Sequence, residues 1–132
     1  MTEKEKMLQG KFYDASDPVL KKERKAAREL TSMFNMPGTP RKQRKNLLMS
    51  LLGSTKDQFF IEPTFKCDYG YNIHIGENFY ANFDCIILDV NEVIIGDDVM
   101  FGPKVCIYTA THPVESDLRK QGLEYGLKVV IE

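Results

Sequence analysis

The sequence predicts a mainly β chain, a parallel β-helix preceded by a small α-helical cap. Two observations carry this prediction: the composition changes near residues 53–57, and a six-residue repeat runs through the second part. Residues 1–56 are rich in Lys, Arg, Leu and Met, whereas residues 57–132 are rich in Ile, Val, Phe, Asn, Asp and Gly. We therefore divide the 132 residues into an N-terminal helical cap, 1–56, and a partial β-helix, 57–132.

Three predicted helices account for most of the cap. Each begins with a residue whose side chain can accept a hydrogen bond from a free backbone N–H, and each ends at glycine or at proline followed by glycine. Proline directly after the capping residue, which suits the first helical position, strengthens two of the starts. The signals are Thr2 with Glu5 and Gly10, Asp17-Pro18 with Pro37-Gly38, and Thr39-Pro40 with Gly53.

The hexad repeat predicts the β-helix. An aliphatic residue, alanine or phenylalanine opens each of six hexads, and a slip of two residues separates the third hexad from the fourth. Each hexad supplies a short strand and a turn, three hexads close a triangular coil, and the opening residue points inward. Antiparallel strands with glycine turns are the alternative, which the lack of strict alternation disfavours. The opening residues are Ile75, Ala81, Ile87, Ile95, Phe101 and Ile107.

Glycine follows the opening residue at positions 76, 96 and 102. We expect these glycines at turns where a side chain would cost strain. About three coils fit the sequence, and the last one is unfinished at 128–132. A coil cannot bury its own ends. We therefore expect either a chain truncated at its C-terminal end or a second chain that covers the open coil.

Charge is unevenly distributed along the chain. Residues 1–56 hold 13 Lys or Arg against 6 Asp or Glu, and residues 57–132 hold 5 against 13, within a net charge of −1. We expect the basic cap to face the acidic coils. Nine basic residues between positions 21 and 45 suggest a nucleic-acid surface as the alternative, but no nucleic-acid motif accompanies them. We predict solvated outer helix faces and no nucleic-acid partner.

The sequence also bears on the cellular compartment. No apolar stretch approaches the roughly 20 residues that cross a bilayer, so no membrane partner is expected. The N-terminal residues are charged where a signal peptide would be apolar. The three cysteines form no CxxC pair, which fits a reducing compartment. These observations predict a cytoplasmic protein.

The hexad rhythm breaks at His112, after Tyr108-Thr-Ala-Thr. Residues 113–127 show no period and predict a loop that protrudes from the coil. Histidine exchanges a proton near neutral pH, so His112 at this break is a candidate catalytic base. A structural loop histidine is the alternative. His74 lies between two inward isoleucines, so we expect it to point outward, on a turn, without a chemical role.

Several segments together resemble the maltose/galactoside O-acetyltransferases, with forms closer to the maltose branch. The resemblance covers about residues 3–131 and implies a left-handed parallel β-helix of hexapeptide repeats. It also implies acetyl transfer from acetyl-CoA to a sugar hydroxyl. The segments are Gly10–Asp14, Asp68–Gly76, Asn78–Phe83, Leu88-Asp89-Val90 and Tyr108–Pro113.

The resemblance also implies roles for individual residues. His112 matches the catalytic base, and the acceptor sugar is held by positions that match Asp14, Asp68 and Asn82. Tyr80 matches a residue that lines the same pocket, and Glu124 falls in the loop that reaches the acceptor. The family is trimeric, with each site between two neighbouring β-helices. Maltose, glucose and galactosides all fit these acceptor residues.

The chain departs from the family pattern after Ile131. In the family, further coils supply most of the contacts to CoA, so the resemblance implies that this chain encodes the acceptor half of the site, whereas the cofactor-binding half lies in missing coils. A non-catalytic truncated protein or scaffold is the alternative function. A metal-dependent hydratase on the same fold needs three histidine ligands per zinc, and the chain has two histidines, so no metal is expected.

Overall fold

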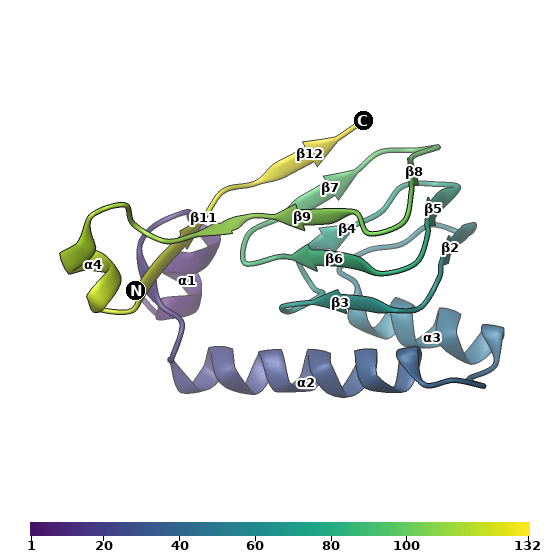
Figure 1. Ribbon diagram of the computed structural model, residues 1–132, viewed down its shortest axis with the longest axis horizontal. Helices are drawn as coiled ribbons and strands as arrows, with labels where there is room; N and C mark the ends of the chain where they lie inside the picture. The colour runs from purple at the N-terminus through teal and green to yellow at the C-terminus, as the bar shows by residue number, and fades with distance from the viewer.

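Nine short strands of the computed structural model, which describes residues 1–132, wind into three parallel sheets (Figure 1). Except where the chain leaves the coil over residues 113–127, residues paired across neighbouring coils are 20 positions apart, as in the row of Ile61, Ala81 and Phe101. This parallel register confirms the predicted β-helix and excludes antiparallel strands here. The sheets are β2 (Phe59–Ile61), β5 (Phe79–Ala81) and β8 (Met100–Phe101); β3 (Phe65–Cys67), β6 (Cys85–Leu88) and β9 (Cys106–Tyr108); and β4 (Ile73–His74), β7 (Val93–Ile95) and β12 (Val129–Ile131).

The hexad openers form the core of the coils. All six are buried, none more than 9% exposed, and they belong to one cluster of 17 buried apolar residues. Each opener stacks on its equivalent in the next coil, as Ile87 does on Ile107. The six-residue period of the sequence therefore marks the residues whose side chains point into the coil.

The hexad glycines do not occupy the strained turns that we expected. Their backbones keep ordinary φ angles, and the left-handed positions fall instead on residues with side chains. Gly76 is required for a different reason: a Cβ there would lie 2.4 Å from the backbone of Gly96 in the next coil. Gly102 has no atom near its Cβ position. The left-handed residues other than glycine are Asn78, Asp84, Asp98 and Lys104, with φ of 59–61°.

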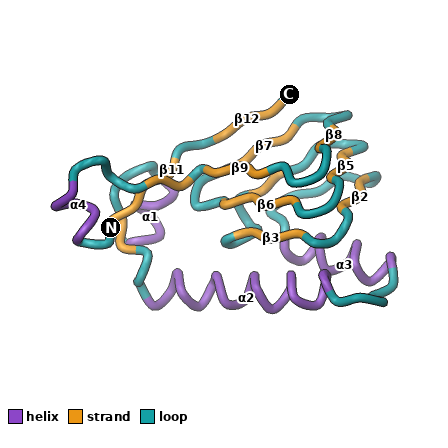
Figure 2. Tube along the Cα trace, in the orientation of Figure 1, coloured by secondary structure: helices purple, strands orange, loops and turns teal.

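Three helices form the cap, and α2 runs along the outside of β3 (Figures 1 and 2). The predicted caps of the first two helices are confirmed, because Thr2 accepts from Glu5 N and Asp17 accepts from Val19 N and Leu20 N. The helices are α1 (Glu3–Leu8), α2 (Pro18–Asn35) and α3 (Arg41–Leu51). No helix is both long enough and apolar enough to span a membrane.

The predicted cap at Thr39 is wrong. Pro40 occupies the N-cap position of α3, where no side chain caps the helix. The Thr39 hydroxyl instead donates to the carbonyl oxygen of Met33 at 3.0 Å, near the end of α2. Thr39 therefore closes the helix before it rather than opening the helix after it.

Apolar packing, rather than charge, joins the cap to the coils. None of the ion pairs of the chain links a cap residue to a coil residue. Phe34 packs edge-on against Phe65, and the side chain of Asn35 makes two hydrogen bonds, of 2.8 and 3.0 Å, with the backbone of Phe65. The expected attraction between a basic cap and acidic coils is therefore not expressed as ion pairs.

Residues 113–127 leave the coil at His112 as expected, but they are folded rather than a plain loop. They contain helix α4 (Ser116–Lys120) and strand β11 (Leu123–Gly126). Strand β11 lies between β1 (Tyr13–Asp14) and β10 (Ala110–Thr111) in an antiparallel sheet. The coil then resumes in register, since Val129 pairs with Val93, 36 positions earlier.

Candidate functional site

A cavity of about 340 Å³ lies beside this small sheet, at the end of the molecule that holds α1 and α4 (Figure 1). Three of the predicted site residues line it together: Asp68, His112 and Glu124. They come from the end of β3, the end of β10 and the middle of β11. The antiparallel sheet therefore brings His112, at the end of β10, and Glu124, from the inserted segment, to a residue of the first coil.

His112 and Glu124 face each other in the cavity. Nε2 of His112 lies 3.6 Å from Oε1 of Glu124, and the histidine side chain is 63% exposed. The hydroxyl of Tyr13 donates to Oε2 of Glu124 at 2.9 Å and so fixes the carboxylate in place. An exposed imidazole beside an anchored carboxylate can accept a proton and be stabilised once it is charged.

Asp68 presents a half-buried carboxyl to the same cavity. Burial, and after it the negative charge of Glu124, raises the pKa of Asp68, while Arg24 and Arg28 oppose the rise. Both arginines also line the cavity. This mixture of acceptors and donors suits the recognition of vicinal hydroxyl groups.

A buried carboxylate positions Asp68 from behind. Asp89 is 0% exposed, and its two oxygens accept four backbone N–H groups, from Asp68, Tyr69, Gly70 and Asn72, at 2.8–3.2 Å. Burial raises the pKa of Asp89 to about 7, against these hydrogen bonds, which favour the charged form. Asp89 thus shapes the turn that carries Asp68.

Asp14 lies next to the cavity without lining it. Its neighbours Tyr13 and Ala15 are lining residues. The Asp14 carboxylate accepts hydrogen bonds from the hydroxyl and the N–H of Ser16, at 2.6 and 2.9 Å, and these bonds lower the pKa of Asp14. The structure therefore brings Asp14 to the edge of the site with a charged side chain.

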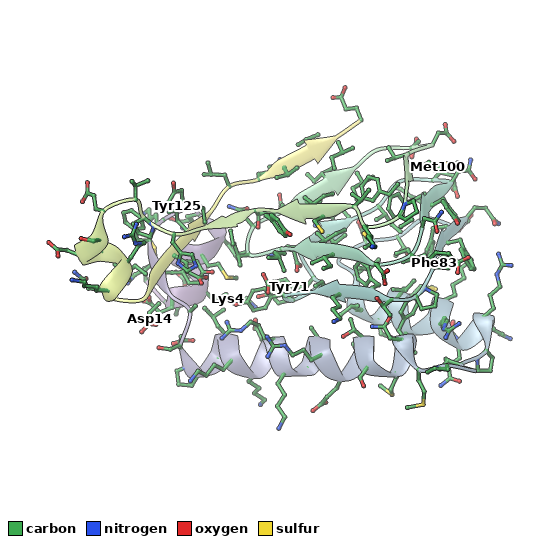
Figure 3. The ribbon with its side chains drawn as sticks, viewed as in Figure 1. Lys4, Asp14, Tyr71, Phe83, Met100 and Tyr125 are labelled. Atoms are coloured by element: carbon green, nitrogen blue, oxygen red, sulfur yellow. The ribbon has the colours of Figure 1, made fainter.

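Tyr80 and Asn82 lie in another part of the chain. Tyr80 is on β5, where its ring stacks on Phe60 with 6.2 Å between centroids. Asn82 follows β5, and its side-chain oxygen accepts from the N–H of Phe83. Phe83 lies at the far end of the molecule from Asp14 (Figure 3). Within one chain, these two predicted residues are not brought to His112.

Sequence reasoning gave no role to four residues of this region. Tyr13 and Asp89 belong to segments that resemble the family, but no role was predicted for them. Arg24 and Arg28 were considered only as basic residues of the cap. Arg24 donates to the hydroxyl of Tyr69 and to the carbonyl of Ala15, both at 2.7 Å, and so ties α2 to the site. The helical spacing of Arg24 and Arg28, four apart, was the available signal.

His74 lies on strand β4 rather than on a turn. Its Nδ1 is 2.8 Å from the hydroxyl oxygen of Ser54, and its Nε2 is 3.9 Å from a carboxylate oxygen of Glu92. It is apart from the residues that line the His112 cavity. No group of three or more His, Cys, Asp or Glu side chains is arranged to hold a metal ion.

Comparisons with known proteins agree with this geometry. The family model described as the maltose acetyltransferase hexapeptide capping motif matches residues 6–56. A maltose O-acetyltransferase from Clostridium difficile is 52% identical, with a TM-score of 0.95 over 97% of this chain and 69% of its own. A galactoside acetyltransferase in complex with coenzyme A is 33% identical, with a TM-score of 0.91 over 97% and 64%.

A third relative is the nodulation protein L of Rhizobium meliloti, which is 44% identical over 98% of this chain and 72% of its own length. The chain thus spans about two thirds of the length of the proteins it matches. The close structural agreement with hexapeptide-repeat acetyltransferases confirms the expected fold class, a left-handed parallel β-helix with an N-terminal helical cap.

Proposed function

We propose that this chain, which belongs to the maltose/galactoside O-acetyltransferase family, supplies the acceptor half of an enzyme that moves acetyl from acetyl-CoA to a sugar hydroxyl. One observation carries the proposal: His112, Glu124 and Asp68 line a single cavity, with an imidazole nitrogen 3.6 Å from an anchored carboxylate. Acetyl-CoA is the co-substrate of this reaction.

His112 acts as the general base. It takes the proton of the acceptor hydroxyl while that oxygen attacks the thioester carbonyl, and the proton passes on to the departing thiolate. The Glu124 carboxylate, held by Tyr13, stabilises the imidazolium that forms in between. A positioned base of this kind is worth about 10²–10⁴ in rate.

Asp68 and Asp14 bind the acceptor. Their carboxylates accept hydrogen bonds from sugar hydroxyls, while Arg24 and Arg28, which line the same cavity, supply donors. The half-buried position of Asp68 strengthens such bonds, because fewer waters compete for the carboxylate. The acceptor is a sugar such as maltose, glucose or a galactoside.

A homotrimer completes the site. Tyr80 and Asn82 stand away from the His112 cavity of their own chain, on a sheet whose outer face is apolar. Met100, in register with Tyr80, is 76% exposed, and Phe83 is 53% exposed. Packing three copies around an axis covers such a face and carries Tyr80 and Asn82 of one copy to the acceptor held by the next.

Free cysteines support a reducing, cytoplasmic setting for this reaction. Cys67, Cys85 and Cys106 form no disulfide, and burial raises the pKa of the Cys67 thiol and lowers its reactivity.

The test is an acetyl-transfer assay with His112→Ala in a full-length enzyme, in which the donor coils accompany this acceptor half. We expect turnover to fall by about 10²–10⁴ because the base is lost. Titration with maltose measures acceptor binding separately, and His112→Ala should alter it much less than Asp68→Ala does. The matched control is His74→Ala, since His74 is a second partly exposed histidine that lies outside the cavity. Near-normal turnover of His112→Ala would overturn the assignment.

A further inference from the structure

The His112 cavity continues into a second cavity beyond Asp68. This second cavity, of about 450 Å³, shares three lining residues with the first, Arg28, Asp68 and Leu88. We call it the α2 groove, because it lies between one face of α2 and the outer face of β3 and β6. Its volume is within the range of about 300–1,000 Å³ that is usual for small-molecule sites. Neither His112 nor Glu124 lines the α2 groove, so the acetyl-transfer step leaves its use open.

Hydrogen bonds hold α2 in place at both ends of the groove. Towards the acceptor site, Arg24 donates to the hydroxyl of Tyr69 and to the carbonyl oxygen of Ala15, both at 2.7 Å. At the other end, the side chain of Asn35 makes two hydrogen bonds with the backbone of Phe65. At a rise of about 1.5 Å per residue, the stretch between these two attachments is about 16 Å long. The groove is therefore preformed, which lowers the cost of ordering its walls around a ligand.

The free polar side chains of the α2 groove are mostly hydrogen-bond donors. Arg28 and Ser32 lie one turn apart on the same face of α2, and Lys66 lines the groove from β3. All three residues are exposed, and their side chains form no ion pair and no hydrogen bond within the chain. Asp68 adds a carboxylate acceptor where the two cavities meet. These groups together suit a ligand that carries several hydroxyls.

Apolar side chains lie directly beside these polar groups. Lys66 pairs with Ile86 across β3 and β6, and two positions further along the same strands Asp68 and Leu88 point to the same face of the sheet. Ile86 and Leu88 are both half-buried. A pyranose ring carries hydroxyls at its edge and C–H groups on its faces, so it can use both kinds of contact. A simple anion would leave the apolar side chains uncovered, and a purely apolar ligand would leave the donors without partners.

We propose that the α2 groove is a second acceptor subsite, which holds the sugar unit next to the one that is acetylated. This inference rests on the proposed function, because the reacting unit is the one held beside His112. The acceptor is then an oligosaccharide of at least two units. Its second unit lies between Ser32, Lys66 and Leu88, and Asp68 contacts both units near their linkage.

Calorimetric titration of the chain with glucose and with maltose tests this proposal. We expect maltose to bind at least about tenfold tighter than glucose, because its second unit adds hydrogen bonds and apolar contacts. Ser32→Trp places a bulky ring in the α2 groove at an exposed helix position, and should reduce the affinity for maltose to about that for glucose. Binding of glucose should change by less than about threefold, since Ser32 does not line the His112 cavity.

The matched control is Ser50→Trp, the same substitution at an exposed position of α3 that lines neither cavity. It should leave maltose binding within about twofold of the parent. Lys66→Ala removes a donor from the groove without adding bulk. It should weaken maltose binding by about threefold or more and leave glucose binding unchanged.

Several outcomes would overturn the second subsite. Equal affinities for glucose and maltose would remove it and leave the acceptor site beside His112 intact. Equal losses of glucose and maltose binding in Ser32→Trp would show that the groove does not hold a separate unit. Ser32→Trp could instead change the oligomeric state in light scattering while maltose binding is unchanged, which would assign the groove to the contact between copies. If neither sugar binds the parent chain, the proposed function fails together with the subsite.

Discussion

Asp89 shows how much of the acceptor site depends on one buried side chain. Its carboxylate satisfies four backbone N–H groups in residues 68–72. Asp89→Ala leaves these donors without partners in a buried turn, where each unsatisfied group costs about 1–3 kcal/mol. We expect a loss of about 3 kcal/mol or more in the free energy of unfolding, measured by chemical denaturation.

Asp97→Ala is the control for this loss. Asp97 also caps a turn between coils, but it accepts only the N–H of Glu77, at an exposed position. Its removal should cost less than about 1.5 kcal/mol. Equal losses for the two variants would show that the four hydrogen bonds of Asp89 have no special weight.

Asp68 predicts a pH dependence of stability. Because burial and Glu124 raise its folded pKa above the ordinary value of 3.8, the folded chain holds this proton more tightly than the unfolded chain. The contribution of Asp68 to the free energy of unfolding is then fully present below about pH 3.8. It is lost as the pH rises through the folded pKa. Asp68→Asn does not titrate and should avoid this loss.

Denaturation of the parent and of Asp68→Asn at pH 4 and pH 7 measures the effect. The variant should gain stability relative to the parent as the pH rises, at the expense of acceptor binding, a common trade-off at functional sites. Asp117→Asn, on the exposed helix α4, controls for general charge effects. A gain that shrinks towards pH 7 would contradict the assignment.

Between neighbouring coils, the glycines that follow the hexad openers should differ in how well they tolerate substitution by alanine. A Cβ at Gly76 would meet the carbonyl group of Gly96 at 2.4 Å, and the backbone of a packed coil cannot move away cheaply. Gly76→Ala should therefore cost about 1–3 kcal/mol. Gly102→Ala meets no atom within 4 Å and should gain about 0.4–1 kcal/mol by restricting the unfolded chain. Thermal unfolding of both variants checks the difference, and similar melting temperatures would contradict it.

The coils were predictable from the sequence because their contacts repeat. Inward positions recur with the six-residue period, so the burial of Ile75, Ile87 and Ile107 can be predicted from the sequence. The sheet of β1, β11 and β10 could not be predicted in this way. Its strands are two to four residues long, and Tyr13 pairs with Glu124 across 111 positions, so no local period marks the contact.

The candidate site was predictable only in part for the same reason. His112 stands at a break in the period, which is visible in the sequence. In the sequence, Arg24 and Arg28 look like ordinary solvated residues of a helix. Only the structure shows that they line the same cavity as Asp68. The position of α2 beside the site depends on tertiary contacts, namely the apolar packing of the helix on the coils.

For the whole molecule, the outward-facing apolar column of Phe60, Tyr80 and Met100, of which Met100 is 76% exposed, predicts assembly. We expect the chain to be a trimer in light scattering at micromolar concentration. Met100→Lys places a charge on this column and should shift the population to monomers. Met49→Lys, at a methionine of α3 that is 54% exposed and lies off the column, should remain trimeric. A stable monomer of the parent chain would contradict the proposed assembly.

The segment that leaves the coil after His112 returns it in unchanged register, since Val129 meets Val93 just as Val93 meets Ile73. The register of the coils therefore does not depend on the length of the inserted segment 113–127. The sequence and length of this segment can change between related enzymes without disturbing the coils. One restriction travels with it: β11 is paired to β1, and the hydroxyl of Tyr13 is bonded to Glu124. Evolution of new acceptor preferences should thus replace positions 13 and 124 in concert, although the two lie at opposite ends of the chain.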